Sequence, residues 1–300
     1  IRCEGDSVRI DFADQAVMAV PYDVPIIGYN RKAINTLRLW QAEGLDEFNF
    51  TDFDNQKYLD ASRNAIMAEA ISNVLYPNDN TEQGLILRLK QQYFFCSASL
   101  QDIVKRYKAK YGDSFKKFPE VYAIQLNDTH PTVSIPELIR ILMFKEGMSF
   151  NEAFDIARKT FNYTNHTVMA EALEKWDVSL FRKVIPTIYD IIGLIDAKLK
   201  SDMQKLDKSR GEIEVLSILQ DNRIHMANMA VYATSHTNGV AELHTEILKN
   251  DVLRAWYATY PERFCNKTNG ITPRRWLGLC NPELSALITE KLGTDEWITN

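Results

Sequence analysis

The apolar residues of the chain recur at helical spacing in three long stretches. From Tyr58 to Leu75 they return every three or four positions, and Pro77 follows the end of the pattern. The spacing returns from Leu85 to Tyr107, and that stretch ends in a basic cluster that complements the helix dipole. The third stretch, Val178 to Leu199, contains Pro186, where we expect a bend. These stretches predict long helices.

Other segments favour strands and loops. Val8 to Tyr29 is rich in alternating and β-branched residues and is interrupted by Pro21 and Pro25, so it predicts two short strands joined by turns. Leu37 to Trp40 predicts another short strand. Residues 200–216 are charged and punctuated by glycine, which is typical of a surface loop.

One segment has the order strand, loop, helix. Val121 to Leu126 predicts a buried strand and Ser134 to Phe144 a helix, with residues 127–131 as the loop between them. Ser134 and Glu137 have the spacing of a capping box at the start of that helix.

The same order occurs a second time. Thr160 to Thr164 predicts a strand, residues 165–167 its exit loop, and Met169 to Trp176 the start of a helix. Farther on, the apolar segment Met226 to Val240 runs into a polar turn. Strands that alternate with helices predict an α/β fold.

Composition narrows the function classes. The 300 residues are 45% hydrophobic and 25% charged, within the range of soluble globular proteins. A net charge of −5 gives no basic surface for nucleic acid or an anionic membrane. No apolar run approaches the roughly 20 residues that span a bilayer.

The four cysteines are far apart, and no histidine shows metal-ligand spacing, so we expect no disulfide framework and no metal site. A reducing cytoplasmic location is the expectation. The first residues contain neither an initiator methionine nor a signal peptide, and the chain stops just after a helical pattern, so both ends look cut.

Three polar residues follow the two predicted strands. Because ligands of open α/β sheets bind at the carboxyl ends of the strands, Asp128, His130 and His166 are candidates for one site. The alternative is that Asp128 caps a turn and that each histidine satisfies a buried carbonyl group.

The run from Asn266 to Trp276 is the most distinctive of the chain. Asn269 and Gly270, followed by Pro273, predict a tight turn that opens a helix. Amide side chains and unpaired helix N–H groups would then face one point, an arrangement suited to a polyhydroxylated or anionic ligand.

This run resembles a signature of the glycogen, starch and maltodextrin phosphorylases, which use pyridoxal phosphate to cleave α-1,4-glucans with inorganic phosphate. Further segments resemble the same family, in its order and at compatible spacing, and the resemblance extends over nearly the whole chain. These segments are residues 20–25, 35–40, 73–91, 121–142, 163–176 and 266–282.

The resemblance implies a helix-rich α/β fold, part of the N-terminal Rossmann-like domain of a two-domain glycosyltransferase of the GT-B type. Residues 1–265 would belong to that domain, and residues 266–300 would form the crossover and the first element of the C-terminal domain. It also implies a homodimer in which the helix from Tyr58 to Asn73 packs against its twin. The alternative for that helix is an ordinary core helix.

The resemblance also assigns site residues. His166 corresponds to the histidine whose main-chain oxygen and ring lie against the reacting glucosyl unit, and Asn269 to an asparagine that bonds sugar hydroxyls. Asp79 and Asn80 match a loop that gates the site and touches the glucose 2-hydroxyl. The alternative for Asp79 and Asn80 is a surface turn.

Four more residues would line the pocket beside the sugar: Arg88, Asp128, His130 and Thr167. We expect Arg88 to pair with an acidic side chain such as Asp79. Lys105 and Arg106 fall where animal phosphorylases bind the phosphate of an AMP activator, although a basic helix end is the favoured explanation for them. Thr81 replaces an aromatic residue of the family's purine site.

The reaction implied is that of an α-glucan with phosphate to give α-glucose 1-phosphate with retained configuration. The cofactor would be pyridoxal phosphate, but no lysine here matches the one that forms its Schiff base, and no glycine-rich phosphate loop occurs. We therefore expect the 300-residue chain to be inactive alone.

Two other functions stay open. A non-catalytic glucan-binding or assembly module would use the same residues without a cofactor. A retaining glycosidase would use Asp79 and Asp128 as its two carboxylates.

Overall fold

A four-stranded parallel sheet forms the centre of the molecule. The computed structural model describes residues 1–45 and 49–299, and its central sheet has the order β10-β9-β5-β4. Its strands are β4 (Ile124–Asn127), β5 (Phe161–Thr164), β9 (Thr237–Gly239) and β10 (Phe264–Asn266). All three pairings are parallel, so the carboxyl ends of the strands meet at one edge.

Helices connect these strands, as parallel pairing requires. The two between β4 and β5 are α5 (Ser134–Phe144) and α6 (Phe150–Thr160), and α11 (Glu242–Ile247), the π-helical turn η5 (Leu248–Val252) and α12 (Arg254–Thr259) lie between β9 and β10. Helix α5 has the predicted bounds. Its residues Ser134–Ile139 are all buried, as in a helix surrounded by protein.

The long connection from β5 to β9 holds a second, antiparallel sheet. Its order is β6-β8-β7, formed by β6 (Lys175–Asp177), β7 (Leu219–Gln220) and β8 (Arg223–His225). The helices of this connection are α7 (Val178–Val184), α8 (Pro186–Lys205), α9 (Arg210–Leu216) and α10 (Met226–Tyr232). The bend expected at Pro186 is a break between two helices, since α7 ends at Val184 and α8 begins at Pro186.

Three local expectations were wrong. Residues 169–176 do not begin a helix beyond the short turn η4 (Ala170–Ala172), because Lys175–Asp177 pair with β8 instead. Residues 200–216 are mainly the end of α8 and helix α9, which Ser209 and Glu212 begin with a capping box. Ser134 makes no side-chain cap at α5.

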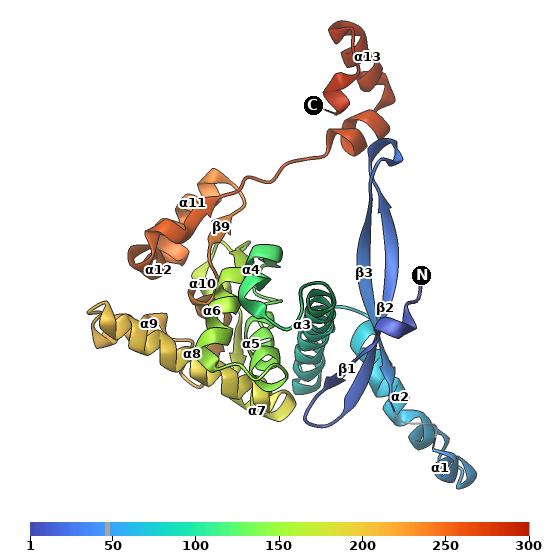
Figure 1. Cartoon of the computed structure of the whole chain (residues 1–300), viewed down its shortest axis with the longest axis vertical. Helices are drawn as coiled ribbons and strands as arrows, with labels where there is room; N and C mark the ends of the chain where they lie inside the picture. Colours follow the sequence, from blue (N-terminus) through green and yellow to red (C-terminus); the bar gives the residue numbers. More distant parts are fainter. Residues whose placement is uncertain (46–48, 300) are drawn as a thin grey trace.

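Helix α3 (Glu82–Tyr111) crosses the body beside α5, and it extends the predicted helix at both ends (Figure 1). It starts where the Thr81 hydroxyl accepts the Gly84 N–H, and it ends at Gly112, which has a φ of +78°. The short helix α4 (Phe118–Val121) precedes β4, so the predicted strand Val121–Leu126 begins three residues late.

A long antiparallel hairpin projects from the body (Figure 1). It joins β2 (Ala16–Ile27) and β3 (Ile34–Gly44), and β1 (Val8–Asp11) pairs with the start of β2. Both strands are longer than predicted. The Asp23 N–H donates to the Ile1 carbonyl group at the outer edge of β2, away from β3. Backbone groups alternate along a strand, so the nitrogens of Pro21 and Pro25 face the same outer edge. Neither proline therefore removes a hydrogen bond to β3, and β2 continues through both.

Helix α2 (Tyr58–Asn73) packs on β3 and follows the short helix α1 (Phe50–Asp54). The predicted helix from Tyr58 is confirmed. Several of its apolar side chains are exposed, among them Leu59, Ile66 and Met67.

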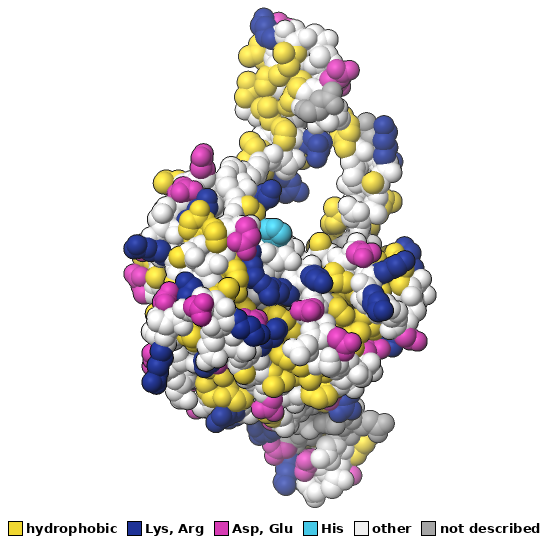
Figure 2. All heavy atoms as spheres, turned by 60° about the vertical axis from the view of Figure 1, so that its left-hand side comes forward, with side chains coloured by type: hydrophobic (Ala, Val, Ile, Leu, Met, Phe, Trp, Pro, Cys, Tyr) yellow, Lys and Arg dark blue, Asp and Glu magenta, His cyan; other side chains and the backbone are white. Residues whose placement is uncertain are grey.

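The last part of the chain extends away from the body. After β10 an extended segment leads to the π-helical turn η7 (Arg274–Leu279) and then to α13 (Pro282–Leu292), near the tip of the hairpin in Figure 1. None of the described residues from 265 to 299 is buried. Figure 2 shows apolar side chains on the surface of this segment.

Candidate active site at the carboxyl ends of the parallel strands

The chain turns sharply where β4 ends. Asp128 has a φ of +67°, in the left-handed region, and two hydrogen bonds hold it there. Its N–H donates to the Thr164 carbonyl at 2.8 Å, and its Oδ1 accepts the Thr129 N–H at 2.7 Å. The turn ties the ends of β4 and β5 together.

A cavity of about 320 Å³ opens beside this turn. It brings together five of the residues that the sequence singled out and six that it did not, of which three matter below. The five are Asp79, Arg88, Asp128, His130 and Thr167, and the three are Glu174, Lys175 and Trp176. Residues from four separate segments therefore share one polar cavity.

Arg88 is the link between two walls of this cavity. Its Nη1 pairs with Asp79, the acidic partner expected from the sequence, and its Nη2 lies 3.4 Å from Oε1 of Glu174. The guanidinium carbon also lies 5.8 Å from the centre of the Trp176 ring. The loop that carries Asp79 is thus bound to the segment before β6.

Two residues that line this cavity each have a buried polar atom without a partner among the described residues: Oε2 of Glu174 and the indole Nε1 of Trp176. The other Glu174 oxygen accepts from Gln92 at 2.9 Å as well as from Arg88. Buried polar atoms are nearly always hydrogen-bonded, so these two atoms mark a polar wall whose hydrogen bonds are incomplete.

His166 lies just after β5 and is exposed, and it does not line the cavity that Thr167 lines. Its Nε2 lies 2.6 Å from Oδ1 of Asn127, the last residue of β4. An amide oxygen can only accept, so in the neutral ring Nε2 carries the hydrogen and Nδ1 is left as an acceptor. Asn127 therefore selects the tautomer of His166.

Asn80 and Asn269 also lie outside the cavity lining. Asn80 is exposed, and its N–H donates to Oδ1 of Asn78 within the loop. The N–H of Asn269 donates to the Val240 carbonyl just after β9 at 2.9 Å, and its side chain is exposed. Asn269 is thus anchored beside the carboxyl end of β9.

Lys105 and Arg106 lie on α3 and do not line this cavity. Lys105 lies 3.3 Å from Asp6, and Nε of Arg106 lies 3.0 Å from Asp102. Asp102 and Asp6 also bind Arg38 from the hairpin. Carboxylates of the chain thus already contact both basic side chains, and their role in effector binding stays a prediction.

Sequence reasoning missed Asn127 and Glu174 as site residues. Both lie in the segments that supplied the other candidates: Asn127 stands directly before Asp128, and Glu174 directly precedes β6. Only their partners across the fold reveal their positions, since Glu174 meets Arg88 across 86 residues of chain.

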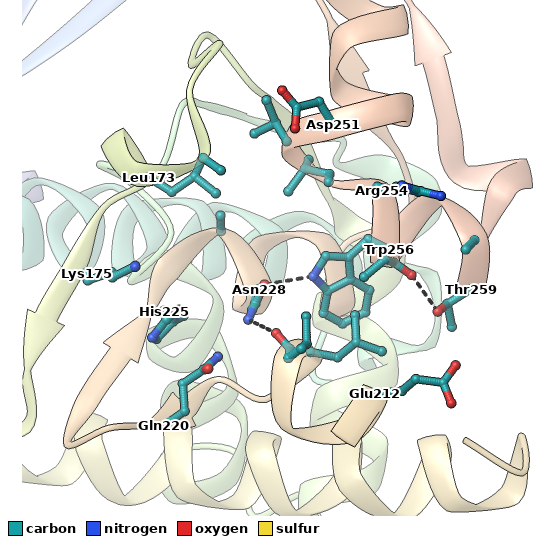
Figure 3. Close-up of a pocket in the computed structure, with 18 of the residues that line it drawn as sticks. Leu173, Lys175, Glu212, Gln220, His225, Asn228, Asp251, Arg254, Trp256 and Thr259 are labelled. Carbon is teal, nitrogen blue, oxygen red and sulfur yellow. Dashed lines mark hydrogen bonds between the residues drawn. The ribbon is translucent and has the colours of Figure 1, made fainter. Parts of the chain in front are cut away.

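A larger cavity, of about 720 Å³, lies between α9 and α12. In Figure 3 the Trp256 indole in its wall donates to Asn228 at 2.8 Å, and Asn228 donates to the carbonyl group of Val215. Asn228 also donates to the carbonyl group of Ser217. Burial lowers the pKa of His225 in this wall, and the nearby Lys175 lowers it further. None of the site residues that the sequence singled out lines this larger cavity.

No group of three or more potential metal-ligating side chains occurs within residues 1–45 and 49–299. In the same part of the chain, no helix combines the length and hydropathy needed to cross a bilayer.

Comparison with known proteins identifies the family of this chain. The family model for carbohydrate phosphorylases matches residues 3–300. The chain is 46% identical over 296 residues to the H isozyme of α-glucan phosphorylase from Triticum aestivum, covering 95% of this chain and 36% of that protein.

Two other relatives show the same pattern. Glycogen phosphorylase 2 of Dictyostelium discoideum is 47% identical over 294 residues, covering 95% of this chain and 29% of the relative. The brain form of human glycogen phosphorylase is 46% identical over 299 residues, covering 95% of this chain and 35% of the relative. The chain spans about a third of the length of these curated relatives, and it belongs to the carbohydrate phosphorylase family.

Proposed function

We propose that this chain supplies the glucan-binding side of an α-glucan phosphorylase. The reaction is the attack of inorganic phosphate on a terminal α-1,4-linked glucose, which gives α-glucose 1-phosphate with retained configuration. The names of the relatives support the substrate class. Within this structure, the proposal is carried by the convergence of five residues that the sequence singled out on one polar cavity beside Asp128.

The residues of the cavity suit a neutral sugar. Sugars are bound through many small hydrogen bonds, and the cavity offers carboxylate, imidazole, hydroxyl and indole groups from Asp128, His130, Thr167, Glu174 and Trp176. A site of this kind rejects ligands that leave its buried polar groups unpaired. We propose Asp79 and Asn80 as the gate of this pocket, and Arg88 as the residue that anchors the gate.

We propose His166 and Asn269 as the residues closest to the reacting glucosyl unit. Positive charge develops on the sugar ring in the transition state, and the main-chain oxygen of His166 would stabilise it. With Nε2–H committed to Asn127, the free Nδ1 can accept a sugar hydroxyl. Asn269 would bond hydroxyls from the opposite side.

The division of the chain is also proposed. Residues 1–265 would form part of a Rossmann-like N-terminal domain of the GT-B type, and residues 266–300 the crossover into the next domain. The absence of buried side chains from residue 265 to 299, within the described chain, supports a segment that packs on other protein surface. Exposed Leu59, Ile66 and Met67 on α2 support a homodimer through that helix.

Pyridoxal phosphate does not fit the residues of this cavity. A Schiff base needs a lysine held in a water-poor site. Lys90 is the buried lysine of the described residues, and it pairs with Asp14 outside the cavity, while Lys175 lines the cavity but is exposed. We therefore propose the cofactor only for the intact enzyme, and we propose that the 300-residue chain releases no glucose 1-phosphate alone.

Calorimetric titration of the purified chain with maltoheptaose tests the glucan-binding role. We expect binding by the wild type and weaker binding by Glu174→Ala. His236→Ala is the matched control, because His236 is exposed and directly precedes β9 at the opposite edge of the sheet. Absence of binding, or equal losses in both variants, contradicts the proposal. Release of glucose rather than glucose 1-phosphate would instead favour a glycosidase.

A further inference from the structure

His244 is the one buried histidine among the described residues, with 7% of its surface exposed. It lies on α11, and both ring nitrogens have partners. The N–H of Val240 donates to Nδ1 at 3.1 Å, and Nε2 lies 3.3 Å from the Thr167 carbonyl oxygen. Since Nδ1 accepts, Nε2 carries the hydrogen and donates to Thr167. The ring is therefore held as a single neutral tautomer.

The two partners of His244 belong to the two segments that carry the proposed sugar contacts. Thr167 directly follows His166 after β5. Val240 follows β9, and its carbonyl accepts the Asn269 N–H at 2.9 Å. A continuous path of hydrogen bonds thus runs from the loop of His166 to Asn269 through one imidazole ring.

Close packing fixes the helix that carries this ring. A Cβ added to Gly239 would lie 2.9 Å from the Cα of Thr245, so α11 approaches the end of β9 as closely as only glycine allows. The Thr245 hydroxyl also lies 3.2 Å from Oδ1 of Asn266 at the end of β10. His244 therefore projects from a backbone that both strands hold in place.

We propose that His244 is a positioning residue that sets the distance between the His166 loop and Asn269, so that both can contact one sugar. The role in sugar binding rests on the proposed function. The two hydrogen bonds of His244 to Val240 and Thr167, called the clamp below, are a property of the chain itself. His244 does not act on the substrate, because both ring nitrogens are committed to the main chain.

Nitrogen-15 NMR of the imidazole rings tests the clamp directly, since the chain has only five histidines. The expected wild-type spectrum shows His244 as the neutral Nε2–H tautomer. A protonated ring or the Nδ1–H tautomer at neutral pH overturns the proposal, and this result requires no variant.

Variants then separate positioning from packing. His244→Phe keeps a ring but removes both hydrogen bonds, so we expect shifted His166 signals, faster amide exchange at Asn269 and about tenfold weaker maltoheptaose binding. His244→Asn can keep the bond to Val240, and His244→Gln the bond to Thr167, so both should recover part of the loss. His236→Phe is the control, with unchanged His166 signals.

A merely structural role predicts a different result. In that case His244→Phe lowers the thermal midpoint while the His166 signals and the Asn269 exchange rate stay as in the wild type, and this outcome overturns the proposal. If His244→Phe does not fold, the Asn and Gln variants decide by the same signals. If the wild type binds no maltoheptaose, the proposed function fails, whereas the NMR and exchange data still decide whether the clamp exists.

Discussion

The side-chain oxygen of Asn127 lies 2.6 Å from Nε2 of His166, and this contact joins the ends of two neighbouring parallel strands. Both side chains are exposed, so the bond stabilises the fold little and mainly fixes the orientation of the imidazole. The chemistry available at His166 therefore depends on a residue 39 positions earlier.

Asn127→Ala should release that orientation. We expect the His166 ring to change from one neutral tautomer to a mixture of two, since Nε2 loses its acceptor, with little change in the free energy of unfolding. Imidazole nitrogen-15 shifts at neutral pH measure the tautomer. Asn162→Ala, on β5, is a control, and an unchanged His166 signal in Asn127→Ala would show that Asn127 does not select the tautomer.

His166 and Asn269 should matter for turnover more than for folding. In an intact phosphorylase that carries this chain, we expect Asn269→Ala to lower kcat/KM about 10- to 100-fold, because each lost sugar contact weakens transition-state binding. His166→Ala should have a similar effect through the ring. Initial rates and thermal midpoints of the same samples provide the measurement, and parallel losses in both would assign a structural role.

Asp128 should tolerate asparagine but not a β-branched residue. Its φ of +67° suits aspartate and asparagine, and an asparagine oxygen can still accept the Thr129 N–H. We expect Asp128→Asn to change the free energy of unfolding by less than about 0.5 kcal/mol and Asp128→Val to lower it by about 1–3 kcal/mol. Urea unfolding measures both, and equal losses would contradict the role of backbone strain.

Glu137 should be among the most sensitive residues of the core. It is fully buried and accepts hydrogen bonds from Tyr93, Ser97 and Arg140. Glu137→Ala leaves the Arg140 charge without its partner, so we expect a loss of about 3–5 kcal/mol in the free energy of unfolding.

The exposed pair of Asp60 and Arg63 on α2 is the control for Glu137. Asp60→Ala should cost less than about 1 kcal/mol, because solvent screens an exposed pair. Chemical unfolding of both variants gives the comparison. Similar losses at the two sites would mean that burial does not decide the effect.

His225 should make the stability depend on pH. Burial, with Lys175 adding to it, lowers the pKa of His225 below the ordinary value of 6.5. As pH falls, His225 is therefore protonated in the unfolded chain before it is protonated in the folded chain. The contribution of neutral His225 to the free energy of unfolding is present above pH 6.5, and it is lost as pH falls from 6.5 through the lowered pKa of the folded state.

An NMR titration of His225, together with urea unfolding at several pH values, tests this dependence. Lys175→Ala should raise the pKa of His225, because it removes a nearby positive charge. His225→Gln should flatten the fall in stability below pH 6.5. A His225 that titrates above 6.5 in the wild type would reverse the sign of the effect.

Local pattern predicted the elements whose stability depends on nearby residues. The bounds of α5, the start of α2 and the break at Pro186 followed from apolar spacing and from proline, which act within a few residues of chain. The predictions for residues 169–176 and for a capping box at Ser134 were wrong because distant partners competed. Lys175–Asp177 pair with β8, and Glu137 binds α3.

The sequence by itself determined the family, since its motifs and their order are properties of the chain, and it placed Asp128, His130 and Thr167 after the right strands. Only the tertiary structure decided that Glu174 meets Arg88, that Asn127 selects the tautomer of His166, and that His244 joins Thr167 to Val240. The physical reason is that a hydrogen bond depends on a few tenths of an ångström between atoms, and the packing of strands and helices, not the spacing along the chain, sets those distances.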